Sequence, residues 1–133
     1  MSRAGTSLAM TALVVPEYDE AIAFYRDLLG LSLIEDSDLG DGKRWVVLGG
    51  PEGGRLLLAR AANDEQRAAI GRQAGGRVGW FLDSADFAAD HARMVASGVE
   101  FTDGPREEPY GTVAVFTDPY GNRWDIIQRT KAA

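Results

Sequence analysis

The chain has 133 residues, of which 45% are hydrophobic and 26% are charged, as in an ordinary globular domain. Its formal net charge of −6 disfavours nucleic acid and anionic membranes as partners, because both require basic surface, and weakly favours neutral or cationic ligands. The absence of cysteine excludes disulfides, thiolate nucleophiles and thiolate metal sites. No apolar run approaches the roughly 20 residues of a membrane span, and residues 1–15 do not resemble a signal peptide, so we expect a cytoplasmic protein.

The first half of the chain predicts one strand, one helix and three further strands. Residues 6–15 form an apolar run that Pro16 ends. Residues 19–29 have an apolar stripe at helical spacing and acidic residues in the first turn, and Gly30 suits the position after the last turn. The three further strands are expected at 31–35, 44–48 and 55–60, with a turn at 38–42 between the first two of them.

After a polar, Gly-rich connector at 61–76, which predicts about one helical turn, the same order of elements returns. A strand at 78–82 precedes a helix at 86–96, which Gly98 ends as Gly30 ends the first helix. Three strands complete the second half, with a charged, proline-bracketed loop between the first two: strand 99–102, loop 103–109, strand 111–116 and strand 124–129.

The repeat predicts an α+β fold of two tandem βαβββ modules within a single domain, 1–133. The first module covers 6–60, the connector 61–76 and the second module 77–129. One helix covers only one face of its sheet, so the other face needs a partner. We therefore expect the two modules to curl a mixed sheet around a shared cavity, which is a natural site for a small molecule.

The stretch TDPYGNRWDIIQ, 117–128, places a tight turn directly before the last strand. Alternation along that strand puts Trp124 and Ile126 on one face and Asp125 on the other. A carboxylate between apolar neighbours either lines a cavity or holds a partner. If Asp125 faces the cavity, Trp124 packs in the core beneath a helix.

Two motifs carry a resemblance to a known family. With AIAFYRDLLGL at Ala21–Leu31 and FTDPYGNRWD at Phe116–Asp125, the chain resembles the vicinal oxygen chelate (VOC) superfamily, which includes glyoxalase I, extradiol dioxygenases, fosfomycin-resistance enzymes and bleomycin-binding proteins. The resemblance covers nearly the whole chain and implies the glyoxalase/bleomycin resistance fold. It does not fix one activity, because the fold hosts several chemistries.

The resemblance also implies where a metal would bind. In metal-using members four ligands, usually His, Gln or Glu, come one from each of four strands. Carried onto this chain, these positions fall on Met10, on the neighbourhood of Leu58 to Arg60, on Arg77 or an immediate neighbour, and on Asp125. Only Asp125 offers an oxygen ligand, and the single histidine, His91, is expected on a helix as a partly buried residue. We therefore expect no metal cofactor; if a divalent metal does bind, Asp125 is its ligand.

Five residues are candidates for contacting a ligand: Met10, Trp45, Arg77, Tyr110 and Asp125. Arg77 and Asp125 either pair across the cavity or each bind a charged group of the ligand, while a solvated Arg77 fits the sequence equally well. Tyr110 either closes the cavity mouth or lies on the surface of a hairpin. Alternation does not assign Trp45, because an apolar run follows it.

Two functions fit these observations. The first is a metal-free protein that binds or sequesters a small cationic or aromatic ligand, resembling the bleomycin-binding branch. The alternative is a metal-dependent lyase, isomerase or dioxygenase with rearranged ligands, in which Asp125 would act with Glu35 or Glu100. Whether the protein is an enzyme stays open at this point. The resemblance further implies a homodimer, with modules side by side or swapped.

Overall fold

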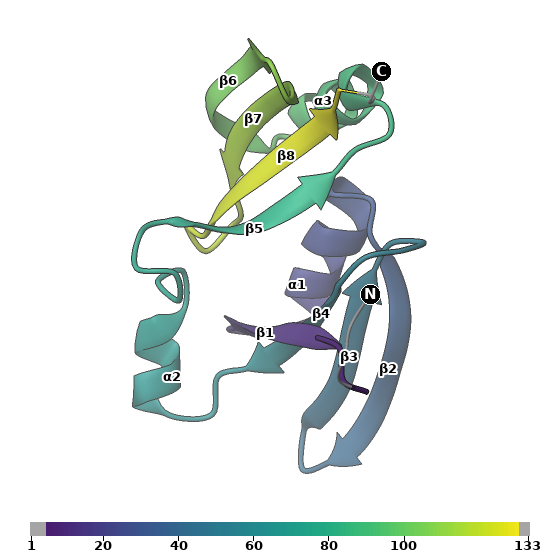
Figure 1. Ribbon diagram of the computed structural model, residues 1–133. Helices are drawn as coiled ribbons and strands as arrows, with labels where there is room; N and C mark the ends of the chain where they lie inside the picture. Colours follow the sequence, from purple (N-terminus) through teal and green to yellow (C-terminus); the bar gives the residue numbers. More distant parts are fainter. Residues whose placement is uncertain (1–4, 131–133) are drawn as a thin grey trace. The chain divides into compact units, whose positions relative to one another are not determined.

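The computed structural model describes residues 5–130, and the chain divides into two compact units, Met1–Arg67 and Ala68–Ala133 (Figure 1). Each unit contains a four-stranded mixed sheet with a helix between its first and second strands. This arrangement confirms the predicted α+β class and the paired βαβββ fold. The expected closure of the sheets around a shared cavity stays a prediction.

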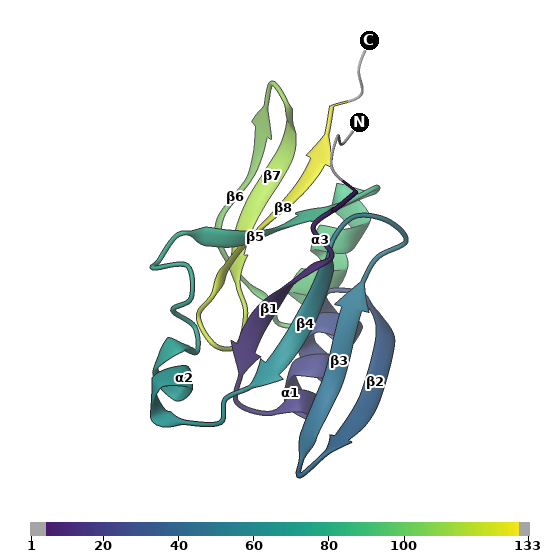
Figure 2. The same ribbon diagram turned by 60° about the horizontal axis from the view of Figure 1, so that its bottom comes forward.

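The sheet of the first module has the order β1-β4-β3-β2, with β1 and β4 parallel and the other pairs antiparallel (Figure 2). One face carries the core, where apolar residues of α1 and of the helix that follows it pack on the strands. The elements are β1 Met10–Val15, α1 Tyr18–Ile22, η1 Ala23–Leu28, β2 Ser32–Gly40, β3 Lys43–Gly49 and β4 Arg55–Arg60.

The helix of the first module is not a uniform α-helix as the sequence pattern predicts. After Ile22 it widens into a π-helix, in which the N–H of Leu29 donates to the carbonyl oxygen of Phe24 at 3.1 Å, five residues back. Gly30 ends the helix at a φ of 87°, a left-handed conformation that favours glycine. The apolar stripe is unaffected: Phe24 and Tyr25 are buried within the widened turns.

The second module repeats this topology, with the order β5-β8-β7-β6 and a parallel β5–β8 pair. The connector holds the short helix α2, Asp64–Ala69, in agreement with the single helical turn expected there. The other elements are β5 Val78–Asp83, α3 Phe87–Ala96, β6 Glu100–Glu108, β7 Gly111–Thr117 and β8 Arg123–Arg129.

The prediction of a loop at 103–109 is wrong. Strand β6 continues to Glu108 and pairs with β7 along its whole length, with shifts of register between Phe101 and Asp103 and between Asp103 and Arg106. Such bulges accommodate extra residues in an edge strand without ending its pairing. The turn expected at 38–42 is likewise shorter, because β2 extends to Gly40. Glycine, proline and charge therefore mark bulged edge strands here rather than loops.

An aromatic series forms much of the core of the second module. Ring centroids lie 5.7 Å apart between Trp80 and Trp124, 6.0 Å between Trp124 and Phe116, and 4.6 Å between His91 and Phe101. Trp124 is 3% exposed, and its indole N–H donates to the Asp118 carboxylate at 3.2 Å. The core position expected for Trp124 and the partly buried helix position expected for His91 are both confirmed.

Within residues 5–130, no helix is long and apolar enough to cross a membrane.

Candidate functional site

Each sheet has one face that packs against its own helix and one face that does not, which we call the helix-free face. In the first module, strand alternation places Met10, Trp45, Val47 and Leu57 on the helix-free face, opposite the buried residues that pack under α1. In the second module the same alternation places Asp125 on the helix-free face. These two faces hold the candidates for ligand contact.

Asp125 lies at the centre of the helix-free face of the second module. It pairs in register with Phe81 on β5 and with Val115 on β7, and Val115 pairs in turn with Asp103 on β6. A row of four side chains therefore crosses the sheet: Phe81, Asp125, Val115 and Asp103. Asp125 thus has two apolar neighbours in its own row, Phe81 and Val115.

The Oδ1 atom of Asp125 is buried and has no hydrogen-bond partner among the residues that the structure describes. Burial raises the pKa of Asp125, because removal from water disfavours the charged form. The positive charge of Arg106 opposes this shift of pKa, and the negative charge of Asp103 adds to it. A ligand that donates a hydrogen bond to this carboxylate would relieve its lost solvation.

Arg106 is the guanidinium whose charge acts on Asp125, yet it binds elsewhere. It pairs through Nη1 with Asp103 and through Nε with Glu108, the second contact at 3.2 Å. No ion pair joins Arg106 to Asp125 in the described part of the chain. Asp125 is therefore left without a protein cation.

The helix-free face of the first module is apolar at the corresponding positions. Met10 pairs with Arg55 at one end of this face, and Trp45, which pairs with Ser37 and is 36% exposed, lies near the other end. Val47 and Leu57 pair with each other between them. The structure thus assigns Trp45, which alternation alone could not place, to the same face as Met10.

Arg77 and Tyr110 lie at opposite ends of the second sheet. Arg77 directly precedes Val78, which pairs with Arg123, whereas Tyr110 directly precedes Gly111, which pairs with Arg129. Arg123 and Arg129 are six residue steps apart on β8, which span about 20 Å at the rise of a strand. The two candidates therefore do not contact one group together within this module.

The ion pair considered between Arg77 and Asp125 is not present. Asp125 is aligned with Phe81, four residues beyond Arg77, which corresponds to about 13 Å along the strand. Arg77 is exposed and forms no salt bridge with Asp125 in the described range 5–130. Tyr110, 55% exposed, lies at the turn between β6 and β7.

Register identifies the residue of the first module that is equivalent to Asp125, next to the stretch that the resemblance implied for a metal ligand. The counterpart of Asp125 in the first module is Leu57, which pairs with Ala12 and Val47 just as Asp125 pairs with Phe81 and Val115. The stretch Leu58 to Arg60 begins one residue later. Neither position carries a carboxylate.

The donors of the described residues do not fit a divalent metal. No group of three His, Cys, Asp or Glu side chains comes close enough to hold an ion within 5–130. A divalent metal needs several protein ligands, and Asp125 alone supplies one carboxylate. We therefore derive no chemistry through a metal, and its absence from the protein stays a prediction.

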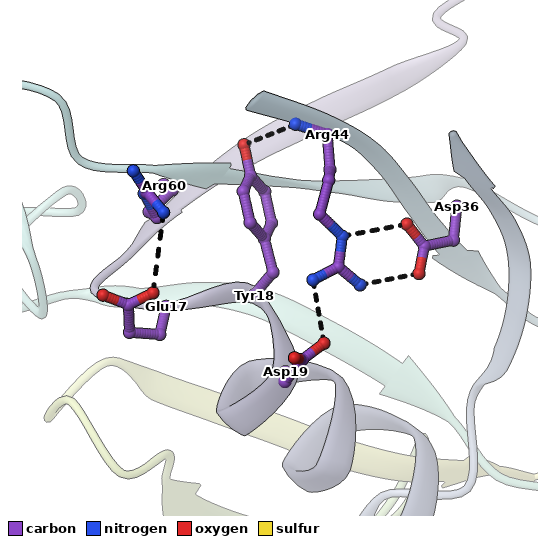
Figure 3. A network of polar contacts seen from close by, with 6 residues as sticks. All are labelled: Glu17, Tyr18, Asp19, Asp36, Arg44 and Arg60. Carbon is purple, nitrogen blue, oxygen red and sulfur yellow. Dashed lines mark hydrogen bonds and ion pairs between the residues drawn. The ribbon is translucent and has the colours of Figure 1, made fainter. Parts of the chain in front are cut away.

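A second concentration of charge, in the first module, serves as a brace (Figure 3). Arg44 donates to both oxygens of Asp36 at 3.1 and 2.7 Å and to Asp19 at 2.8 Å, which ties β3 to β2 and to α1. The guanidinium also lies over the ring of the buried Tyr18, at 5.1 Å. The adjoining hollow of 360 Å³ contains Asp36, Asp38, Gly40, Asp41, Gly42 and Arg44.

Sequence reasoning missed three residues around Asp125: Phe81, Asp103 and Arg106. Phe81 was detectable, because alternation from Trp80 places it on the opposite face, and it is 66% exposed. Asp103 and Arg106 were hidden by the loop predicted there. The bulges of β6 break the alternation that would have shown which of its residues share a face with Asp125.

Comparisons with known proteins agree with this architecture. The model of the "Glyoxalase/Bleomycin resistance protein/Dioxygenase superfamily" matches residues 7–126. A protein of Shewanella frigidimarina (strain NCIMB 400), described as uncharacterized, is 52% identical over 92% of this chain and 93% of its own length.

Two solved structures are similar to the whole chain. The crystal structure of UcmS2 is 26% identical, with a TM-score of 0.77 over 92% of this chain and 97% of that chain. The structure of TnmS3, described as an antibiotic binding protein from Streptomyces sp. CB03234, is 28% identical, with a TM-score of 0.70 over 96% of this chain and 100% of that chain.

Proposed function

Because the chain belongs to the Glyoxalase/Bleomycin resistance protein/Dioxygenase superfamily, we propose that it binds and sequesters a small organic ligand that is cationic or aromatic. The observation that carries this proposal is the buried Oδ1 of Asp125, which no donor among the described residues satisfies. The description of TnmS3 as an antibiotic binding protein supports a ligand-binding role within the superfamily.

The physical basis is the cost of leaving a carboxylate without a partner. An unsatisfied buried polar group costs about 1–3 kcal/mol, and a charge-assisted hydrogen bond from a ligand would recover that cost. Phe81, in register beside Asp125, offers an exposed aromatic ring to the same ligand. Arg77 and Tyr110, near opposite ends of the same sheet, are candidates for peripheral contacts. The apolar surface of Met10 and Trp45 in the first module is a separate candidate for ligand contact.

Binding in this proposal needs no metal. Protein purified without chelators should contain less than about a tenth of an equivalent of nickel, zinc, manganese or iron, measured by inductively coupled plasma mass spectrometry. A stoichiometric metal would contradict this part of the proposal and would favour the alternative of a metal-dependent enzyme with rearranged ligands.

A thermal-shift panel tests the binding itself. Metal-free bleomycin, as a cationic glycopeptide, and a series of aromatic amines are compared on the wild type, on Asp125→Asn and on the control variant Asp64→Asn, whose residue is exposed on α2. At a hundredfold excess over Kd, a ligand stabilises the folded state by about 2.7 kcal/mol. At least one cation should raise the Tm of the wild type and of the control but not that of Asp125→Asn. Equal shifts in all three, or none in any, would overturn the proposal.

We further propose that the protein is a homodimer, as the family resemblance implies, and that it is cytoplasmic. Size-exclusion chromatography with light scattering at micromolar concentration should give twice the mass of the 14.3 kDa chain. A monomer under those conditions would refute the dimer while leaving the binding proposal intact.

A further inference from the structure

We propose that Asp103 and Glu108 keep the Asp125 site receptive to protonated amines by holding Arg106 away from it. This inference rests on the proposed binding function and deepens it, since it names an ammonium group as the ligand chemistry and assigns positioning roles to three residues of β6. The charged ligand group would take the place at Asp125 that Arg106 would otherwise occupy.

Arg106 and Asp125 lie on the same face of the second sheet, within reach of each other. Arg106 pairs with Val113, and Val113 lies two residues from Val115, the register partner of Asp125. Arg106 and Asp125 therefore lie on the same face, two strands and one two-residue step apart, or about 12 Å between backbones. Two extended side chains can bridge that separation, so Arg106 is placed where it could neutralise Asp125.

The guanidinium of Arg106 is already paired with two carboxylates. Nη1 contacts Asp103, and Nε contacts Glu108 at 3.2 Å. Two carboxylates on the same strand thus hold the guanidinium over β6. Asp125 Oδ1, on β8, has no partner in this arrangement.

The charges around Asp125 favour a cationic ligand. With Asp125 ionised, three carboxylates (Asp103, Glu108, Asp125) surround one guanidinium (Arg106), which gives the group a net charge of −2. An anionic ligand would meet repulsion there, and a neutral ligand would leave the carboxylate unsolvated. A protonated amine supplies both the charge and the hydrogen-bond donors, and Phe81 beside it accommodates a cation on its ring.

The consequence is specific. Removing the two carboxylates that hold Arg106 should free it to pair with Asp125 and so close the site, although neither carboxylate touches the ligand. Removing Arg106 as well should reopen the site. A purely structural role of Asp103 and Glu108 would not produce this recovery.

The ligand test uses benzylammonium as the probe, with benzyl alcohol as its neutral analogue, titrated into 15N-labelled protein and followed by NMR. Wild type should bind benzylammonium in preference to benzyl alcohol, and Asp125→Asn should lose about tenfold in affinity for the cation. The double variant Asp103→Asn/Glu108→Gln should lose about as much affinity for benzylammonium. Adding Arg106→Gln to this double variant should bring the Kd back to within about threefold of the wild-type value. Failure of the triple variant to recover would overturn the inference.

The restraint of Arg106 by Asp103 and Glu108 can also be tested without a ligand. The coupling of Arg106→Gln with Asp125→Asn is measured by urea unfolding, first in the wild-type background and then in Asp103→Asn/Glu108→Gln. In the wild-type background, the changes in the free energy of unfolding caused by the two substitutions should add. In the background without the two carboxylates, the unfolding constant of the combined variant should differ by about fivefold from the additive value. Additivity in both backgrounds would overturn the inference.

Two further comparisons separate this inference from the proposed function. Asp64→Asn/Arg67→Gln removes an exposed pair of the same i,i+3 spacing as Asp103 and Arg106, and should change neither readout. If no cation binds the wild type but the urea coupling emerges as expected, the proposed function fails while the restraint on Arg106 stands. If cations bind through Asp125 but no coupling emerges, the restraint fails alone.

Discussion

The two modules have the same strand order and equivalent strand pairing around the centre of their helix-free faces, and they differ in the residue placed there. In the first module Leu57 lies between Ala12 and Val47, and in the second Asp125 lies between Phe81 and Val115. The repeated topology therefore supplies two equivalent positions, of which one is apolar and the other carries an unsatisfied carboxylate. The departure from the repeat, rather than the repeat itself, marks the candidate site.

The helix-covered faces of the two modules resemble each other, because equivalent positions on both are buried in the core. Register equates Leu48 with Phe116, and both residues are completely buried. The modules fill this position with side chains of different size, and the second builds an aromatic series around it. Substitutions that shorten side chains on these faces should therefore lower the free energy of unfolding.

The largest expected effect tests the packed faces. Phe116→Ala should lower the free energy of unfolding by about 3–5 kcal/mol and Leu48→Ala by about 2–5 kcal/mol, because each leaves a cavity in a core that cannot collapse completely. Urea denaturation followed by circular dichroism measures both. A loss below about 1 kcal/mol for either would show that its module is not packed as described. Leu39→Ala, at a side chain that is 53% exposed on β2, is the control and should change little.

The next effect tests the equivalence of the two centres. Leu57→Asp copies the second module into the first and should destabilise the fold by about 1–3 kcal/mol at neutral pH, because the new carboxylate lies among Ala12 and Val47 without a charged partner. The loss should shrink at acid pH, where the carboxylate is protonated. Urea melts at both pH values check this, with Leu57→Met as the apolar control. An unchanged stability at neutral pH would argue that the position is hydrated rather than apolar.

The reverse substitution should have the opposite sign. Asp125→Leu removes an unsatisfied carboxylate and should stabilise the protein by about 1 kcal/mol at pH 7 while abolishing cation binding. Burial raises the pKa of Asp125 in the folded protein. The wild type is therefore most stable relative to this variant below the ordinary aspartate pKa of about 4. It loses that relative stability as the pH rises through the higher pKa of the folded state. The difference between wild type and variant should therefore grow with pH in that window. Asp83→Leu, at an exposed aspartate of the same sheet that pairs with Arg129, is the comparison and should not stabilise the protein at pH 7.

The smallest effect concerns the brace in the first module, which has no counterpart at Asp125. Asp36 and Asp19 raise the pKa of Arg44, so the guanidinium stays charged throughout. Arg44→Gln should cost about 0.5–1 kcal/mol, with a smaller loss at high salt. Arg26→Gln breaks an exposed pair with Asp27 and should cost less than Arg44→Gln in the same urea assay. Equal effects of the two would mean that Arg44 does not connect its three elements.

The sequence predicts the fold well because each module repeats clear local signals. Hydrophobic alternation located the strands, and it separated the buried Trp124 from Asp125 on the opposite face. The surroundings of Asp125 were less accessible, since the bulges of β6 break alternation exactly where Asp103 and Arg106 lie. Of the two alternatives left open for Arg77, the structure shows it exposed and not paired with Asp125, because register with β8 aligns Phe81 with Asp125.

The account depends above all on Asp125 acting as the carboxylate that binds a cation. The most direct measurement is calorimetric titration of metal-free wild type and of Asp125→Asn with the cation that gives the largest thermal shift. A loss of about tenfold or more in Kd on removal of this one charge, with the fold and the Tm preserved, is the predicted result. Equal affinity of the two proteins would contradict the account, because the ligand would then be held without the Asp125 carboxylate, whose buried Oδ1 has no partner among the described residues.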